Sequence, residues 1–252
     1  MEAILYLEKL SKHFGGLKAV DNATLKIREK EITLLIGPNG SGKTTLINTT
    51  TGYYKPDGGR VFFKNKEITG WPMHKICDIG VVRSFQLSLP FKGLSVLGNI
   101  LVSHKENPGE SLINCLHRRK WIKTEEKINK KAFEVIKALG LQQYWDVPTT
   151  SLSAGHLKLV EIGRALMAGA ELIILDEPIC GVNPALADEI FTYINELKNI
   201  YGLTFLIVEH RLDIALKYVD YVYVLNYGKV VCDGNVKHIV NDPMVKKIYT
   251  GE

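Results

Sequence analysis

The chain has 252 residues, 46% of them hydrophobic and 23% charged, a balance that is typical of a globular protein. No apolar run approaches the roughly 20 residues that a transmembrane helix needs, and the N-terminus alternates apolar and charged residues, unlike a signal peptide. The net charge of +5 is not gathered into a basic face with interleaved aromatic residues, so nucleic-acid binding is not expected. We expect a cytosolic protein that reaches a membrane only through a partner.

The first seventy residues predict strands around one glycine-rich loop. Alternating or continuous apolar runs predict strands at 4–10, 19–27, 32–36 and 61–63. Gly15 and Gly16 form a turn between the first two strands, and the fully apolar run 32–36 is typical of a buried parallel strand. A helix is expected from about Lys43.

The middle of the chain has a different character. Between about residues 91 and 150 there is no good strand run, and the charged amphipathic segment 124–139 predicts a mainly helical insertion. Strands and helices alternate again from residue 157, which favours a mostly parallel sheet. The elements expected there are a helix to Met167, a strand at 172–175, a helix at 184–200, a strand at 204–208, a helix at 212–218, and a hairpin of 221–225 with 229–232.

Residues 37–44 fit the pattern G-x-x-x-x-G-K-[ST] between a predicted strand and a predicted helix. Glycines in such a loop allow backbone N–H groups to converge on phosphates, and the helix start adds a partial positive charge. Lys43 is expected to reach the β- and γ-phosphates and the Thr44 hydroxyl to bind Mg²⁺. The motif predicts ATP or GTP binding without fixing its use. The nucleotide-binding candidates are Gly37, Pro38, Asn39, Gly40, Ser41, Gly42, Lys43, Thr44 and Thr45.

Two carboxylates follow the apolar strand 172–175, at the end where ligands bind in an open α/β sheet. Asp176 is expected to hold Mg²⁺ through water. Glu177 is placed to polarise the water that attacks the γ-phosphate. With the phosphate loop, this pair predicts nucleotide hydrolysis.

Residues 152–156 read Leu-Ser-Ala-Gly-His, and a helical pattern at 158–168 follows them. With the phosphate loop and the acidic pair, this segment makes nearly the whole chain resemble the ABC ATPase family, whose signature is usually Leu-Ser-Gly-Gly-Gln. In that family the signature of one subunit closes over the ATP of the other. The resemblance implies a working dimer with two ATP molecules, in which Ser153 and the Gly155 backbone complete the γ-phosphate cage.

This signature departs from the family pattern at two positions. Ala154 adds a methyl group where a backbone should approach a phosphate closely, and His156 replaces an amide with an imidazole. One interpretation is a weakened or regulated site. The other, which we favour because Ser153 and Gly155 remain, is tolerated drift.

The resemblance assigns four more positions. Gln86 matches the glutamine that senses Mg²⁺ and the attacking water, and His210 matches the switch histidine that contacts the γ-phosphate. Phe14 stands where relatives stack an aromatic ring on adenine, although packing is an equal alternative. Asn183 occupies the loop along the dimer seam, where the family usually has an aspartate.

The resemblance implies an α/β fold: a P-loop NTPase (RecA-like) core with an N-terminal antiparallel β subdomain and an inserted α-helical subdomain. Residues 1–90 and 155–235 would form the core with its β subdomain. Residues 91–154 would form the helical signature subdomain, and 236–252 a C-terminal tail. Leu87, Leu89, Phe91 and Leu94 are candidates for the groove that receives a short helix of the permease.

Four segments narrow the resemblance to the branched-chain amino-acid importer ATPases: residues 81–86, 103–121, 209–213 and 248–252. The expected partners are transmembrane permease subunits, a second copy or a related second ATPase, and indirectly an external solute-binding protein. The expected location is the cytoplasmic face of the membrane. Lipopolysaccharide-type exporter ATPases, urea or amide importer ATPases, and a weakly hydrolysing switch subunit remain alternatives. A soluble ABC switch protein and a small-molecule kinase fit less well, because the first usually has two cassettes or a long coiled coil, and the second lacks the signature.

The four cysteines, Cys77, Cys115, Cys180 and Cys232, have no CxxC spacing. The spacing predicts reduced thiols and gives no sign of a disulfide framework or a zinc site.

Overall fold

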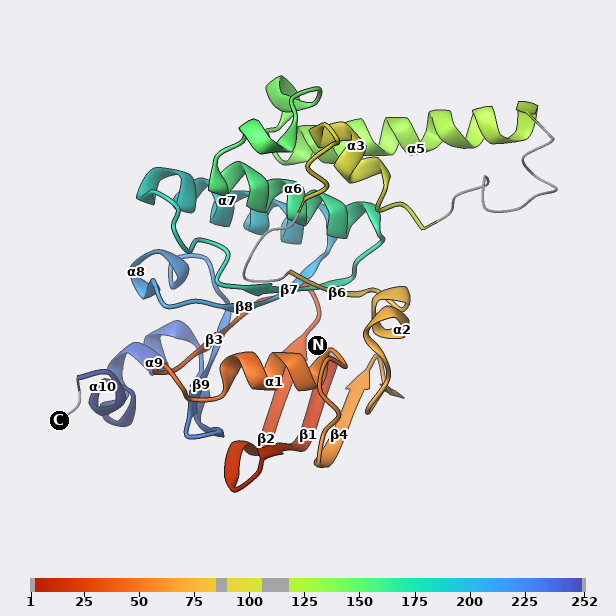
Figure 1. Cartoon of the computed structure of the whole chain (residues 1–252). Helices are drawn as coiled ribbons and strands as arrows, with labels where there is room; N and C mark the ends of the chain where they lie inside the picture. The colour runs from red at the N-terminus through yellow and green to blue at the C-terminus, as the bar shows by residue number, and fades with distance from the viewer. Residues whose placement is uncertain (1–2, 85–89, 106–117, 251–252) are drawn as a thin grey trace.

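The computed structural model describes residues 3–84, 90–105 and 118–250. An antiparallel sheet of four strands has the order β2-β1-β4-β5, and β2, β1 and β4 lie at the bottom of the view in Figure 1. Its strands are β1 (Ala3–Phe14), β2 (Leu17–Arg28), β4 (Gly58–Phe63) and β5 (Lys66–Glu67). The expected turn at Gly15 and Gly16 joins β1 to β2.

A second sheet has six strands in the order β10-β9-β3-β8-β7-β6. They are β3 (Ile32–Ile36), β6 (Val81–Arg83), β7 (Leu172–Asp176), β8 (Thr204–Val208), β9 (Tyr221–Asn226) and β10 (Lys229–Gly234). All pairs are parallel except the β9–β10 hairpin. The strands β3, β7 and β8 are buried along their whole length, as their continuous apolar sequences predict.

Helices cover both faces of the six-stranded sheet. On one face, α6 (Ala154–Met167) and α7 (Pro184–Tyr201) cover the sheet, and α3 (Val96–Leu101) and α5 (Arg118–Ala138) pack on α6. The helix α1 (Lys43–Thr50) lies on the other face with the antiparallel sheet (Figure 1). Shorter helices are α2 (Met73–Asp78), α8 (Leu212–Ala215), α9 (Val236–Asn241) and α10 (Pro243–Thr250), with 3₁₀ turns at Gln142–Tyr144 and Thr149–Ser151. Within the described ranges, no helix has both the length and the apolar character to cross a membrane.

The alternation of side chains along the buried strands creates two hydrophobic cores. On β7, Ile173 and Leu175 face the core shared with α5, α6 and α7, whereas Leu172 and Ile174 face the core shared with α1 and the antiparallel sheet. Successive side chains of a strand point to opposite faces, so one short apolar strand serves both cores. The strand therefore holds its C-terminal residue, Asp176, rigidly between them.

The predicted fold class is confirmed: the structure combines an antiparallel β sheet, a mostly parallel sheet and a helical region before residue 154. The helix predicted at 212–218 ends earlier, at Ala215. Beyond it, Lys217 and Tyr218 donate backbone hydrogen bonds three residues back, to Ile214 and Ala215, and the chain continues as tight turns.

Candidate nucleotide-binding and hydrolysis site

The loop 37–44 connects β3 to α1, as the motif predicts. Gly42, with φ of 103°, begins α1, and a Cβ atom there would lie 2.1 Å from the Ala19 carbonyl oxygen. Gly37 is equally confined, since a Cβ would lie 2.1 Å from the Leu225 carbonyl oxygen. Both positions therefore require glycine, because neighbouring backbone from β2 and β9 fixes the loop from outside.

Lys43 is buried inside this loop. Its Nζ donates hydrogen bonds to the carbonyl oxygens of Gly37 at 2.8 Å and Pro38 at 3.0 Å. Burial lowers the pKa of Lys43, and the nearby carboxylates of Glu177 and Asp176 oppose that effect. The ammonium group is thus aimed into the loop.

The acidic pair lies at the end of β7. Asp176 is buried, and its Oδ2 lies 3.0 Å from Nη2 of Arg83, which also donates to Asn48 on α1. Arg83 is the last residue of β6. Its contacts with Asp176 and Asn48 therefore join β6 to β7 and to α1. Sequence reasoning missed Arg83, since nothing in the sequence relates it to Asp176 until β6 and β7 pair.

Glu177 leaves the strand with φ of 51°, a left-handed conformation that is uncommon for a residue with a side chain. Its Oε1 lies 3.3 Å from Nε2 of His210, which follows β8. Strained backbone of this kind concentrates at functional sites. The structure therefore brings together two predicted catalytic residues from adjacent parallel strands.

Glu209 is a buried carboxylate beneath the histidine. It accepts backbone hydrogen bonds from Ile179 at 2.9 Å, His210 at 2.9 Å and Arg211 at 3.4 Å. Burial raises the pKa of Glu209, while these donors oppose the effect. The side chain thereby joins the segment after β7 to the segment after β8, a role that the sequence did not indicate.

A cavity of about 550 Å³ opens over the loop. Its lining includes Phe14, Glu177, His210 and the predicted loop residues from Asn39 to Thr45. Ser41 Oγ is buried there without a hydrogen-bond partner among the described residues. A buried hydroxyl without a partner, an ammonium group and glycine backbone in one cavity fit the phosphates of a nucleotide.

Two aromatic side chains stand at the mouth of this cavity. Phe14, 43% exposed, packs edge-on against Tyr54 with 5.2 Å between ring centroids. Tyr227, 84% exposed, lies on the β9–β10 turn, where the Gly228 N–H donates to the Ser41 carbonyl at 2.8 Å. Tyr227 was missed because the sequence predicts its turn but not the docking of that turn on the phosphate loop.

The signature residues are not part of this cavity. Ser153 caps α6, and its Oγ lies 2.7 Å from Nδ1 of His156, whose ring packs on Tyr144. Ala154 opens α6 outside the left-handed region, so its exposed methyl group strains no backbone. Gly155 is buried, and a Cβ there would lie 2.3 Å from Leu186 Cδ2 of α7.

Two further predicted positions have different outcomes. Asn183 caps α7, and its Oδ1 accepts the Leu186 N–H at 3.0 Å, so the amide replaces an aspartate as a helix cap. Gln86, the predicted sensor of Mg²⁺ and water, lies outside the described residues.

A second cavity, of about 500 Å³, lies between β6, α2, α3 and α6. Phe91 and Val102 line it, and the Arg164 guanidinium lies over the Phe91 ring at 5.1 Å from its centroid. Of the four predicted groove residues, Phe91 lines this cavity, Leu94 lies outside its lining, and Leu87 and Leu89 are outside the described ranges.

Comparison with known proteins identifies the family. A family model described as ABC transporter matches residues 20–180. The "Probable branched-chain amino acid transport ATP-binding protein LivG" of Methanocaldococcus jannaschii is 47% identical over 99% of this chain and 98% of its own length. The protein of the same name from Archaeoglobus fulgidus is 47% identical over 98% and 95%.

Solved structures lead to the same family. A crystal structure of the ADP conformation of an ATP-binding cassette of an ABC transporter superposes on this chain with a TM-score of 0.86. The two sequences are 46% identical, and the match covers 100% of both chains. A nucleotide-free cassette, also 46% identical, covers 99% of this chain and 100% of its own with a TM-score of 0.85. The chain therefore belongs to the ABC transporter family, as one of its ATP-binding and ATP-hydrolysing subunits.

Proposed function

We propose that this subunit drives the import of branched-chain amino acids through a transmembrane permease. The observation that carries the proposal is full-length similarity, at 47% identity, to two archaeal proteins named for branched-chain amino acid transport. Substrate choice would reside in the permease and an external solute-binding protein. The subunit itself would sit on the cytoplasmic face of the membrane.

In this proposal the cavity over the phosphate loop is the ATP site. Lys43 and the loop amides bind the phosphates, and Phe14 contacts the base. Thr44 and Asp176, with Gln86, would hold Mg²⁺, which supplies neutralising charge at the phosphates. Thr44 is exposed toward the cavity and Asp176 is a buried carboxylate beneath it, so hard oxygen ligands of the required type are present.

Glu177 would hold and polarise the attacking water, and His210 would fix the Glu177 carboxylate and contact the γ-phosphate. His210 Nε2 and Glu177 Oε1 lie 3.3 Å apart, close enough for each group to orient the other. Lys43 stabilises negative charge on the same phosphate, because the buried loop keeps its ammonium group close and poorly hydrated.

The working unit would be a dimer, either of two copies or with a related second ATPase, in which each signature caps the opposite ATP. Ser153, Ala154, Gly155 and His156 stand at the N-terminus of α6, where the partial positive charge of the helix favours an anion. The difference in ATP affinity between closed and open dimers would supply the coupling energy.

One observation favours a second candidate, a subunit that binds ATP but hydrolyses it slowly. The hydroxyl of Ser153, which should cap a phosphate, instead lies 2.7 Å from His156 Nδ1. Closure on the opposite ATP would have to break this contact, at a cost of about 1 kcal/mol.

The cavity beside Phe91 would receive a short helix of the permease. It is apolar along Phe91 and Val102 and carries the Arg164 cation at its edge. It also lies beside Arg83, which pairs with Asp176. We propose that residues 91–154 form the helical subdomain, which contributes to this groove. Residues 1–90 and 155–235 would form the nucleotide-binding core with its β subdomain, and residues 236–252 would form a C-terminal tail.

Reconstitution tests the proposed substrate. The subunit would be assembled with the permease into proteoliposomes, and ATP turnover measured with binding protein loaded with leucine, isoleucine or valine. We expect these amino acids to stimulate turnover and to accumulate inside. Stimulation by urea instead, or outward movement of a lipid, would reject the amino-acid assignment while leaving the ATPase assignment intact.

A further inference from the structure

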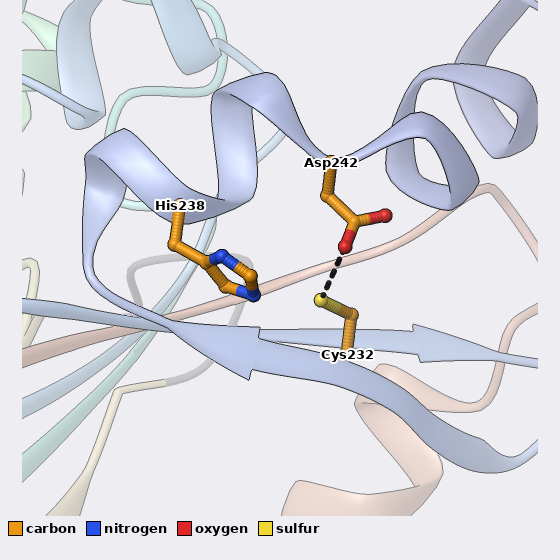
Figure 2. A group of neighbouring side chains, drawn as sticks. All are labelled: Cys232, His238 and Asp242. Atoms are coloured by element: carbon orange, nitrogen blue, oxygen red, sulfur yellow. Dashed lines mark hydrogen bonds between the residues drawn. The ribbon is translucent and has the colours of Figure 1, made fainter.

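Three metal-ligating side chains meet at the C-terminal end of the molecule, away from the nucleotide cavity. Cys232 lies on β10, His238 on α9, and Asp242 at the junction of α9 and α10; Figure 2 shows the imidazole and the carboxylate on the same side of β10 as the sulfur. One ligand atom from each residue lies within 4.8 Å of the other two. The residues are separated in the sequence by five and three positions, a spacing that differs from the CxxC pattern usually associated with zinc.

Backbone donors hold the Asp242 carboxylate, and a helix cap fixes the backbone of His238. Asp242 uses Oδ1 to accept the backbone N–H groups of Met244 at 2.8 Å and Val245 at 3.1 Å, so its carboxylate is fixed with Oδ2 toward Cys232. Asn235 caps α9 by accepting the His238 N–H at 2.9 Å. The two backbone donors to Asp242 are outer contacts of the kind that orient metal ligands in proteins.

Gly234 leaves room for the imidazole ring of His238. A Cβ atom on Gly234 would lie 2.7 Å from His238 Cδ2, so any larger residue there would push the ring from its place. The ring is exposed, whereas Cys232 and Asp242 are half-buried. Access for an ion is therefore from the histidine side.

We propose that Cys232, His238 and Asp242 form a zinc-binding site that fastens the C-terminal helices to the β9–β10 hairpin. Sulfur, imidazole nitrogen and carboxylate oxygen together suit Zn²⁺ and exclude Mg²⁺ and Ca²⁺, which take oxygen ligands. The Cys232 Sγ to Asp242 Oδ2 distance is 3.5 Å. A tetrahedral Zn²⁺ needs about 3.6 Å between such ligands.

Two adjustments complete the site. The exposed imidazole swings toward the sulfur, and water takes the fourth position on the open side. The ion replaces the thiol proton that now points to Asp242, and that proton passes to solvent, leaving a thiolate, a neutral imidazole and a carboxylate around one Zn²⁺. The site is thereby electrically neutral.

Cobalt spectroscopy on the full chain without nucleotide tests the site. Co²⁺ would be titrated into metal-free protein, followed by Zn²⁺. We expect one Co²⁺ per chain with a thiolate-to-cobalt charge-transfer band, displaced by Zn²⁺. Cys232→Ser should abolish the band, and His238→Gln and Asp242→Asn should weaken binding by at least about tenfold. Asparagine can still cap α10, so Asp242→Asn keeps the local fold.

The matched control is Cys180→Ser, which removes an exposed thiol elsewhere and should leave the titration unchanged. No charge-transfer band in the wild type, or a band that persists in Cys232→Ser, would overturn the proposal. Hydrogen exchange gives a second measurement: Zn²⁺ should slow exchange of the α9 and α10 amides in the wild type and not in Cys232→Ser. Equal exchange with and without Zn²⁺ would contradict the fastening role.

Discussion

Ser153 has two possible partners: the His156 imidazole at 2.7 Å and, in the proposed dimer, a phosphate of the opposite ATP. A glutamine at 156 would not compete in the same way. In the sequence Ser-x-x-Gln the glutamine side chain reaches back to the backbone N–H of the capping serine. The serine oxygen still accepts the N–H of residue 156, and its hydroxyl proton is left available. In the altered signature, the His156 imidazole and the phosphate of the opposite ATP would thus compete for the Ser153 hydroxyl.

We therefore expect His156→Gln to raise ATP turnover by about fivefold, the equivalent of releasing one hydrogen bond of about 1 kcal/mol. Steady-state phosphate release would measure it. His74→Gln, an exposed histidine on α2, is the matched control and should have no effect. Unchanged or slower turnover in His156→Gln would mean that the contact does not restrain hydrolysis.

Glu209 provides a prediction about pH. Burial raises the pKa of this carboxyl above its ordinary 4.5. Between pH 4.5 and the raised pKa, the folded chain therefore keeps a proton that the unfolded chain has released. The resulting stabilisation is present below pH 4.5 and is lost as the pH rises through the raised value. Relative to Glu209→Gln, which cannot titrate, the wild type should lose about 1.4 kcal/mol of unfolding free energy per pKa unit of displacement.

Urea unfolding of both proteins at a series of pH values measures this difference directly. The unfolding free energy of the wild type minus that of Glu209→Gln should fall as the pH rises. If this difference stays constant or increases, the three backbone donors outweigh burial in setting the pKa of Glu209.

Sequence reasoning finds residues whose chemistry follows from a motif. Lys43, Glu177 and His210 follow apolar strands, and parallel pairing brings the ends of β3, β7 and β8 to one edge of the sheet. Arg83 and Glu209 were missed because their importance depends on which strands become neighbours and on what they bury. Such information lies in the assembled fold rather than in local spacing.

At the scale of elements, α6 and α7 meet at Gly155. A methyl group there would lie 2.3 Å from Leu186 Cδ2 and 3.2 Å from Val182 Cγ1. We predict that Gly155→Ala lowers the unfolding free energy by about 1–3 kcal/mol, the usual cost of overpacking. Denaturant unfolding measures it.

Gly93→Ala is the control, because a methyl group there meets nothing within 4 Å. Equal stability of the Gly155 variant and this control would contradict a packing role and leave the signature glycine to phosphate binding alone.

The β9–β10 turn positions Tyr227 beside the nucleotide cavity. Its Gly228 backbone binds both Ser41 and Asp21, so Tyr227 is carried to the mouth of the nucleotide cavity opposite Phe14. If the two rings hold the base together, Tyr227→Ala should weaken ATP binding by about three- to tenfold, as aromatic contacts of this kind suggest.

Fluorescent-nucleotide titration would measure the affinity, with Tyr201→Ala, an exposed tyrosine at the end of α7, as control. Tyr227→Ala binding ATP as tightly as the control would remove Tyr227 from the base site.

An alternating or continuous apolar run identified the strands β1, β3 and β7, and the helix α7 was also predicted. The helices α2, α9 and α10 have eight residues or fewer and too few turns to show a pattern. The three-residue β6 likewise becomes a strand only by pairing with β7. Tertiary pairing, rather than intrinsic preference, stabilises these elements.

At the scale of the whole molecule, the phosphate loop and the signature lie in different parts of one chain. The signature residues do not line the cavity over the chain's own phosphate loop, and in the proposed dimer they would meet the phosphate loop of the partner. The sequence could predict this division from its resemblance. It could not show that Ser153 is engaged by His156 before closure.

The proposed hydrolysis depends most on Glu177, acting within an ATP-bound dimer. The most direct measurement is ATP turnover by the wild type beside Glu177→Gln, with light scattering of both proteins in ATP and Mg²⁺. We predict turnover by the wild type, a loss of at least about a hundredfold in the variant, and an ATP-dependent dimer trapped by the variant. Wild-type turnover in Glu177→Gln, or a variant that stays monomeric with ATP, would contradict the account.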